Sequence, residues 1–301
     1  MGPLVSIIIP TFNRHIEIKR AIESCFLQSY KNIEVVISDN SENNKTEEVI
    51  RGIKGNIVYT RNECNIGPIL NWRNALDKAS GDWVVIMPDD DFFINAYYIE
   101  DCLNIIKEHD VKVVFSDCIL AYPDANIIAS SNKKGIHDSS FILKNIWSKV
   151  NIPTIANFFN RELAYSFDIF YNNKFLYSDI ELWLKILKNT QKCYFYDIPS
   201  IKYVFHDSNI VTNMNVNSII ENSHFITNVF DPSDNLLEIY LTRYMFFTQS
   251  IYKFPFISYA LTFRDEYDLS FLWLGKVVLL YVGKFLKRNL ISFVRVLRVL
   301  M

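Results

Sequence analysis

The first 120 residues alternate short apolar runs with amphipathic segments, and this alternation limits the possible folds more than any other feature. The predicted strands are residues 4–9, 33–38, 56–60, 83–87 and 111–120. The predicted helices are residues 16–27, 47–53, 68–79 and 95–109. Strands that are apolar on both faces and separated by helices are typical of a parallel sheet covered on both sides. We therefore expect an α/β fold with a mostly parallel, Rossmann-like sheet.

The later part of the chain has a looser pattern. Short strands at residues 193–198 and 201–205 are mixed with a helix at residues 179–187. Beyond residue 214 the sequence is typical of helices. We expect one domain over residues 1–212, divided near residue 120, and a helical C-terminal region over residues 213–301.

Bulk composition excludes some classes of protein. The net charge of −2 gives no overall attraction to nucleic acid. The five cysteines are scattered, without a Cys-x-x-Cys pair, which favours reduced thiols in a cytosolic protein over a disulfide framework or a zinc site.

Polar residues follow three of the predicted strands. Pro10, Thr11, Asn13 and Arg14 follow the first, Asp39 ends the second, and the triplet Asp89–Asp91 follows the fourth. Ligands of parallel sheets bind outside the carboxyl ends of the strands. Carboxylates gathered there are suited to Mg²⁺ or Mn²⁺ and a diphosphate, although aspartates are also common in plain turns and helix caps.

Four segments resemble family 2 glycosyltransferases, which have the GT-A fold. They are Val5-Ser-Ile-Ile-Ile-Pro-Thr-Phe-Asn-Arg14, Val35-Val-Ile-Ser-Asp39, Asn65-Ile-Gly-Pro68 and the triplet Asp89–Asp91, in the order seen in the family. The resemblance covers about residues 4 to 210. It implies a nucleotide-sugar half at residues 1–120 and an acceptor half at residues 121–212.

The resemblance also implies roles for individual residues. Residues expected to contact the nucleotide sugar are Pro10, Thr11, Asn13, Arg14, Asp39, Asn65, Gly67, Asn71, Arg73 and Asp89. Asp90 and Asp91 are expected to ligate a divalent cation, Mg²⁺ or Mn²⁺. Pro88 stands where the family's common Leu-Asp-x-Asp-Asp form has its first aspartate, which leaves open which members of the triplet touch the metal.

A second motif supplies the acceptor side. The segment Leu176-Tyr-Ser-Asp-Ile-Glu-Leu-Trp-Leu-Lys185 resembles the family's Glu-Asp-x-Asp-Leu-Trp-Leu, with Ser178 in place of the glutamate. The resemblance implies that Asp179 is the catalytic base of an inverting displacement. Trp183 is expected to stack on the acceptor. His206 is expected near the diphosphate or metal, with Val204 in place of the family's arginine.

The last 33 residues are apolar and basic. Lys276 interrupts the apolar stretch, so no clean membrane span of about 20 residues exists. The basic residues are Lys276, Lys284, Lys287, Arg288, Arg295 and Arg298, with no acidic residue among them. Such helices suit an anionic membrane surface, while a helical cap on the core is the alternative. We expect a peripheral enzyme at the inner face of a bacterial membrane, with a lipid-linked oligosaccharide acceptor of O-antigen or capsule assembly.

Two other functions compete with a glycosyltransferase. A catalytically inactive sugar-binding or scaffold protein on the same fold is one, since Pro88 and Ser178 depart from the family pattern. A nucleotidyltransferase is the other, but it needs a glycine-rich phosphate loop after the first strand, which this chain lacks. A dinucleotide-dependent dehydrogenase is disfavoured because no Gly-x-Gly-x-x-Gly follows that strand.

Overall fold

The computed structural model describes residues 2–153, 155, 157–167, 169–170, 178–206, 215–230, 237–252, 256–267, 269 and 271–281. The chain divides into two compact units, residues Met1–Asn213 and Met214–Met301.

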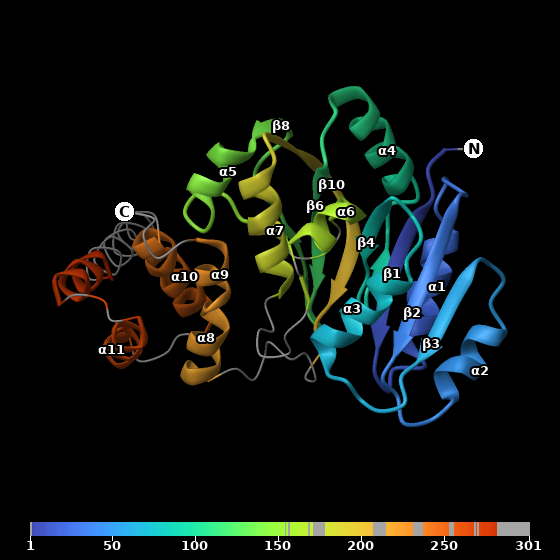
Figure 1. Cartoon of the computed structure of the whole chain (residues 1–301), viewed down its shortest axis with the longest axis horizontal. Helices are drawn as coiled ribbons and strands as arrows, with labels where there is room; N and C mark the ends of the chain where they lie inside the picture. Colours follow the sequence, from blue (N-terminus) through green and yellow to red (C-terminus); the bar gives the residue numbers. More distant parts are fainter. Residues whose placement is uncertain are drawn as a thin grey trace, which may run out of the picture. The chain divides into compact units, whose positions relative to one another are not determined.

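A ten-stranded mixed sheet forms the centre of the first unit (Figure 1). Its strand order is β3-β2-β1-β4-β9-β6-β10-β5, with β7 added to β6 and β8 added to β10. The strands are β1 (Val5–Thr11), β2 (Ile33–Asp39), β3 (Ile57–Arg61), β4 (Trp83–Ile86), β5 (Phe92–Phe93), β6 (Val113–Ala121), β7 (Asn126–Ala129), β8 (Gly135–Asp138), β9 (Phe158–Asn160) and β10 (Lys192–Val204).

Most long strands of this sheet point the same way. β1 pairs in parallel with β2 and β4, β2 with β3, and β6 with β10. β9 is antiparallel to both β4 and β6, so β4 and β6 share a direction. The expectation of a mostly parallel sheet is confirmed, with short antiparallel strands inserted. The carboxyl ends of β1, β2, β4, β6 and β10 consequently lie along one edge, called here the carboxyl edge.

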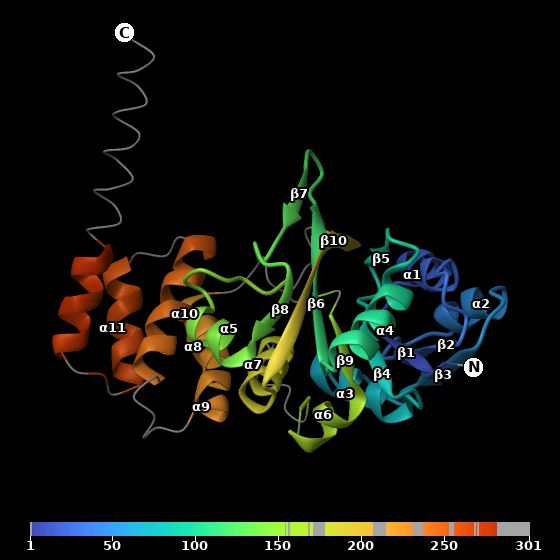
Figure 2. The ribbon, with the colours of Figure 1, turned by 90° about the horizontal axis from the view of Figure 1, so that it is seen from above.

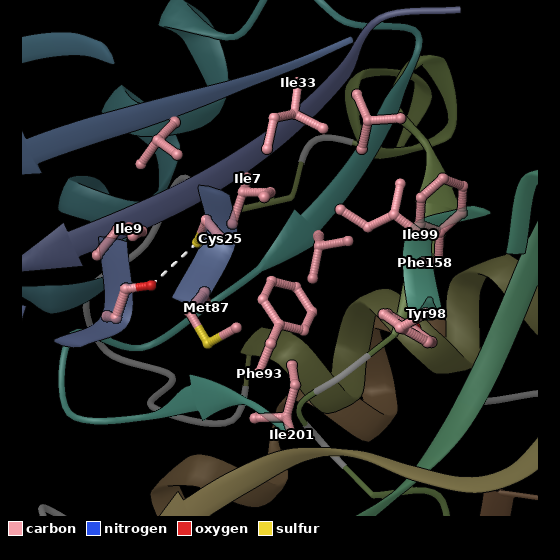
Figure 3. Packing of buried hydrophobic residues seen from close by; sticks show 14 of the residues in the cluster. Ile7, Ile9, Cys25, Ile33, Met87, Phe93, Tyr98, Ile99, Phe158 and Ile201 are labelled. Carbon is pink, nitrogen blue, oxygen red and sulfur yellow. Dashed lines mark hydrogen bonds between the residues drawn. The ribbon is translucent and has the colours of Figure 1, made fainter. Parts of the chain in front are cut away.

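Helices cover both faces of the sheet. They are α1 (Glu17–Phe26), α2 (Lys45–Arg51), α3 (Pro68–Lys78), α4 (Tyr98–His109), α5 (Ser139–Asn145), α6 (Arg161–Ser166) and α7 (Ser178–Asn189). Figure 3 shows the core on one face, where Cys25 of α1 and Tyr98 and Ile99 of α4 pack against Ile7 and Phe158. α3 packs on the opposite face of β1 and β2 (Figure 2).

Sequence patterns located the long elements and missed the short ones. The two strands predicted at residues 193–198 and 201–205 form one strand, β10, whose register against β6 shifts between Tyr196 and Ile201. The strands β5, β7, β8 and β9 were not predicted, because two to four residues are too few to show a periodicity.

The second unit is helical in the residues described. It contains α8 (Val216–Ser223), α9 (Phe225–Val229), α10 (Leu237–Tyr252), α11 (Phe256–Glu266) and a further helix at residues 271–281. Buried aromatic side chains hold it together, and Trp273 Nε1 donates to Thr242 Oγ1 at 2.8 Å. Across the described residues, every helix is too short or too polar to cross a membrane.

Candidate active site

Asp89 joins the ends of two neighbouring strands at the carboxyl edge. β1 and β4 are adjacent, so the residues that follow them meet. Thr11 Oγ1 donates a hydrogen bond to Asp89 Oδ2 at 2.7 Å, and the Phe12 amide donates to the same oxygen at 3.4 Å. Burial and then the neighbouring charge of Asp90 raise the pKa of Asp89 to about 7, although Thr11 and Arg14 oppose this shift.

Asp90 is contacted by a guanidinium and an imidazole. Arg14 Nη1 and His206 Nε2 both donate to Asp90 Oδ2, the histidine at 2.7 Å. Arg20 Nη2 donates to the Asp90 carbonyl at 2.8 Å. Burial lowers the pKa of Arg14, but the charges of Asp89 and Asp90 outweigh it and raise that pKa, so the guanidinium stays charged. The structure thus brings Arg14, Asp90 and His206 together.

Asp91 is fully buried, and only one of its two carboxylate oxygens is hydrogen-bonded. Its Oδ1 accepts from the Val204 amide at 2.9 Å, while its Oδ2 has no hydrogen-bond partner. Burial, followed by the charge of Asp90, raises the pKa of Asp91 well above its usual range. A buried carboxylate oxygen without a partner is costly unless a proton, a water molecule or a ligand satisfies it.

The acidic triplet fits a divalent cation in its chemistry. Hard cations take carboxylate oxygens, and Asp91 Oδ2, although buried, has no hydrogen bond that a cation would have to displace. Within the described residues, however, no three acidic, histidine or cysteine side chains converge as a ready-made metal group. Asp90 Oδ2 is already shared by Arg14 and His206, so joint ligation by Asp90 and Asp91 requires these contacts to rearrange.

Asp39 occupies the predicted end of the second strand, but its oxygens are used internally. It is fully buried; Oδ1 accepts from the Ser41 amide at 2.7 Å and Oδ2 accepts from the Tyr59 hydroxyl at 2.9 Å. The Asn13 amide donates to Ser41 Oγ at 2.8 Å, which ties the loop after β1 to the end of β2. A contact from Asp39 to a nucleotide base would have to share one of these oxygens.

The loop before α3 is linked to the same edge. Gly67 has a positive φ of 84°, which favours glycine, and its amide donates to Asn65 Oδ1 at 2.9 Å. On α3, Asn71 Nδ2 donates to the Thr11 carbonyl at 3.1 Å, and Asn71 Oδ1 accepts from Ser38 Oγ at 2.6 Å. Asn71 therefore holds the ends of β1 and β2 together. Pro10 lies buried within β1, beside Ser38.

Arg73 faces a different part of the molecule. Its Nη1 donates to the Ile169 carbonyl at 3.2 Å, its Nε pairs with Asp77 Oδ1 at 2.8 Å, and its guanidinium lies 4.8 Å from the centre of the Tyr165 ring. These contacts place Arg73 between α3 and α6. The expectation that it lines the nucleotide pocket therefore has no support from its described contacts.

Asp179 lies at the start of α7, where the helix dipole favours a negative charge. It is 9% exposed. Its link to the triplet is Tyr203 on β10: burial, followed by the charges of Asp91, Asp90 and Asp179, raises the pKa of Tyr203. The Tyr203 hydroxyl thus interacts electrostatically with both acidic groups. Their members Asp91 and Asp179 are 88 positions apart in the sequence.

Trp183 is placed differently from the sequence expectation. It is 2% exposed, and its ring packs edge-to-face with Phe115 and Phe159. This is the ring arrangement of a core residue. The buried ring gives no support to the expected sugar stacking: the family motif identified the residue, but could not show that its side chain packs on the sheet.

Sequence reasoning also missed residues that complete the carboxyl edge. Tyr203 and the Val204 amide were passed over, although both stand in the segment that suggested His206. Arg20 and Tyr59 were missed because they come from a helix face and an interior strand position that have no motif.

Comparison with known proteins gives consistent results. The sequence model described as "Glycosyl transferase family 2" matches residues 6–166. The chain is 25% identical over 221 residues to a GalNAc(5)-diNAcBac-PP-undecaprenol beta-1,3-glucosyltransferase of Campylobacter jejuni, covering 72% of this chain and 70% of that protein. It is 34% identical over 94 residues to the Escherichia coli UDP-Glc:alpha-D-GlcNAc-diphosphoundecaprenol beta-1,3-glucosyltransferase WfaP, covering 31% of this chain and 38% of that one.

Solved structures show the same fold. S. aureus TarS 1-349 superimposes with a TM-score of 0.68 at 17% identity, covering 87% of this chain and 79% of that chain. The same protein in complex with UDP-GlcNAc gives a TM-score of 0.65 at 18% identity, covering 87% and 81%.

Proposed function

Because the chain belongs to glycosyl transferase family 2, we propose that it transfers a sugar from a nucleotide-diphosphate donor to a saccharide acceptor with inversion at the anomeric carbon. The observation that carries this proposal is that two separate acidic groups have one electrostatic neighbour, Tyr203. One is the crowded triplet Asp89–Asp91, and the other is Asp179 at the start of a helix; both act electrostatically on Tyr203.

The triplet belongs to the leaving-group side. Asp90 and Asp91 would hold a divalent cation, Mg²⁺ or Mn²⁺, which supplies positive charge to the departing diphosphate. Arg14 and His206 already donate to Asp90, and both can turn a donor to a phosphate oxygen. Asp89 holds Thr11 and Arg14 in place beside them.

Asp179 belongs to the acceptor side. In a single displacement, the acceptor oxygen forms a bond to the anomeric carbon as the bond from that carbon to the diphosphate breaks. The hydroxyl proton passes to a carboxylate oxygen of Asp179, and the electron pair leaves with the nucleoside diphosphate. The start of α7 favours the ionised form of Asp179 that this step needs.

The names of the relatives suggest the substrates. Two of them act on undecaprenol-diphosphate-linked saccharides, and one of these uses UDP-Glc. We infer a UDP-hexose or deoxyhexose donor and a lipid-linked oligosaccharide acceptor in cell-surface polysaccharide assembly, such as O-antigen or capsule. The enzyme would then work in the cytoplasm, at the inner face of the membrane.

The helix at residues 271–281 supports peripheral membrane contact. Trp273 and Val277 are its buried side, while Phe271 and Leu272 are more than two-thirds exposed and Lys276 is exposed between apolar neighbours. Apolar side chains beside a lysine suit an anionic lipid surface. The other basic residues predicted to contribute, from Lys284 to Arg298, lie outside the described residues.

Vesicle flotation tests this contact. Phe271→Glu with Leu272→Glu should reduce binding to vesicles containing anionic lipid, whereas Leu27→Glu, at an equally exposed leucine of the first unit, should not. Equal flotation of all three proteins would contradict membrane contact through this helix.

Ligand binding and product release test the function itself. Nucleotide sugars should raise the melting temperature more in Mn²⁺ than in EDTA, because ligands that bind only the folded state stabilise it by mass action. The ligand that stabilises most should release its nucleoside diphosphate when an undecaprenol-diphosphate saccharide is added. Binding without transfer would favour the inactive sugar-binding alternative, and pyrophosphate release would favour a nucleotidyltransferase.

A further inference from the structure

Three aromatic rings form a continuous series from the acidic groups to the surface. Tyr203 lies near the end of β10, with its ring centre 4.7 Å from that of Phe205 and the planes at 64°. The Phe205 ring stacks on Tyr122 at 4.2 Å and 10°. Tyr122 stands at the turn between β6 and β7, where its amide donates to the Ala125 carbonyl at 2.8 Å. We call these three residues the aromatic series.

The inner end of the series lies at the reacting groups. Tyr203 directly precedes Val204, whose amide donates to Asp91 Oδ1 at 2.9 Å. The charge of Asp179 also acts on the Tyr203 hydroxyl. Tyr203 therefore adjoins the contact between Val204 and Asp91, where the donor diphosphate is proposed to bind.

The outer end of the series is held in place and open to a ligand. The Phe205 amide donates to the Ala121 carbonyl at 2.9 Å, which extends the pairing of β10 with β6 beyond the strand. Tyr122 is 39% exposed despite stacking on Phe205. Figure 2 shows the β6–β7 hairpin extending past its neighbours in the sheet. A large ring at such a position offers an edge or face to a bound molecule.

We propose that Tyr203, Phe205 and Tyr122 form the binding subsite for the acceptor saccharide, an inference that rests on the proposed glycosyl transfer. The apolar C–H faces of sugar rings pack on aromatic rings, and the two tyrosine hydroxyls add hydrogen-bonding groups. This series, and not the buried Trp183, provides the aromatic surface of the acceptor half.

A saccharide fits this position better than the lipid of the acceptor. The sugar that is glycosylated would lie close to the triplet, where the donor is proposed to bind, so the sugars or diphosphate attached to it would come next along the series. Two of the three rings have hydroxyl groups, which suit a ligand with many polar atoms and not a hydrocarbon chain.

Kinetics with two related acceptors test the subsite. The probes are α-N-acetylglucosaminyl diphosphate as its decyl ester and as its methyl ester, chosen because the relatives named above use diphosphate-linked amino sugars. Tyr122→Ala should raise the KM for both probes by roughly tenfold, the loss expected when one aromatic contact is removed. Tyr122→Phe, which keeps the ring, should restore most of the affinity.

A matched control separates this effect from general damage. Tyr97 is 63% exposed at the start of α4, so Tyr97→Ala should leave both KM values unchanged. The dissociation constant of the UDP-sugar donor, measured by calorimetry, should be the same in Tyr122→Ala and in the wild-type protein.

The possible failures are distinguishable. Transfer by Tyr122→Ala with an unchanged KM would overturn the subsite and leave the proposed function intact. A loss seen only with the decyl ester would show that the series binds the lipid chain, which also overturns it. Wild-type protein that binds the donor but transfers no sugar to either probe would overturn the proposed function and the subsite together.

Discussion

Buried carboxylates at the carboxyl edge and at the opposite edge of the sheet, called here the amino edge, differ in how completely they are hydrogen-bonded. At the amino edge, Glu34 of β2 is 3% exposed, and its Oε1 accepts from the hydroxyl of Ser6 and from the amide and hydroxyl of Ser80, with distances from 2.5 to 2.9 Å. At the carboxyl edge, Asp91 is equally buried, yet one of its oxygens has no hydrogen-bond partner.

Their pKa values differ in the same sense. Burial raises the pKa of Glu34, but its hydrogen bonds from Ser6 and Ser80 outweigh burial and lower that pKa. Burial and the charge of Asp90 instead raise the pKa of Asp91. The structural carboxylate of Glu34 is provided with donors by its own chain, whereas Asp91, proposed to bind ligand, is crowded by Asp90 and has one oxygen without a donor.

The largest effect is expected at Asp179, a carboxylate outside both of these groups. Asp179→Asn removes the proposed base and should lower kcat by 10²- to 10⁴-fold, the usual contribution of general base catalysis. Donor affinity should be unchanged, because the triplet is intact. Initial rates of UDP release and calorimetry with the donor measure the two quantities.

Asp138 provides a matched control for this change. It also stands at the start of a helix, α5, and its side chain accepts from the Phe141 amide at 2.9 Å. Asp138→Asn should keep wild-type turnover, since asparagine is an equally good helix cap. Unchanged turnover in Asp179→Asn would remove Asp179 from the mechanism.

At the carboxyl edge, Asp91→Asn should lower turnover about a hundredfold, because it removes one oxygen ligand from the proposed cation site. The amide oxygen can still accept from Val204, so the fold is retained. Burial and the charge of Asp90 already raise the pKa of Asp91 and so disfavour its charged form, and a neutral asparagine should leave the metal-free protein at least as stable as the wild type. Thermal melting in EDTA measures the stability, and activity in Mn²⁺ measures the turnover. Lower stability with full activity would contradict the proposal that Asp91 binds the cation.

At the amino edge, neutralising the buried carboxylate should lower stability and leave activity unchanged. Glu34→Gln replaces charge-assisted hydrogen bonds with weaker ones and places an amide group where Ser80 donates, which should cost about 2 kcal/mol of unfolding free energy. Activity under folding conditions should be near the wild-type value. Urea unfolding measures the loss, with the exposed Glu23→Gln as control.

The stability contributions of the two edges should also depend on pH in opposite directions, and this is the smallest of the expected effects. The pKa of Asp89 is raised to about 7 in the folded state, so the stability that it contributes is full below its ordinary pKa and is lost as pH rises through 7. Glu34 has a lowered pKa, so its contribution is present at neutral pH and is lost in acid. In EDTA, the melting temperature should fall by a few degrees from pH 5.5 to pH 8.

Asp89→Asn isolates the group responsible for this fall. The variant should flatten the decrease between pH 5.5 and pH 8, and Glu34→Gln should not. A wild-type melting temperature that rises over this range would contradict the raised pKa of Asp89.

The sequence predicted the helices and strands that have a clear local pattern of apolar residues. Long strands are continuous apolar runs, long helices have periodic apolar residues, and the shared direction of parallel strands places Thr11, Asp39 and Asp89 at one edge. Family motifs added Asp179, which no periodicity could connect with the triplet.

The remaining features depend on tertiary contacts that no local sequence pattern predicts. Nothing in the spacing of α7 shows that Trp183 packs on Phe115, or that Arg73 turns toward Tyr165. The stacking of Tyr122 on Phe205 depends on the pairing of β6 with β10, which brings together residues 83 positions apart.

The central claim is that the acidic triplet, with the unpartnered oxygen of Asp91, holds a cation for the donor diphosphate. Titration calorimetry of UDP with wild-type protein and with Asp91→Asn, each in Mn²⁺ and in EDTA, tests it most directly. We predict that Mn²⁺ tightens UDP binding at least tenfold in the wild-type protein and has little effect in the variant. The same tightening in both proteins, or none in the wild type, would contradict the claim.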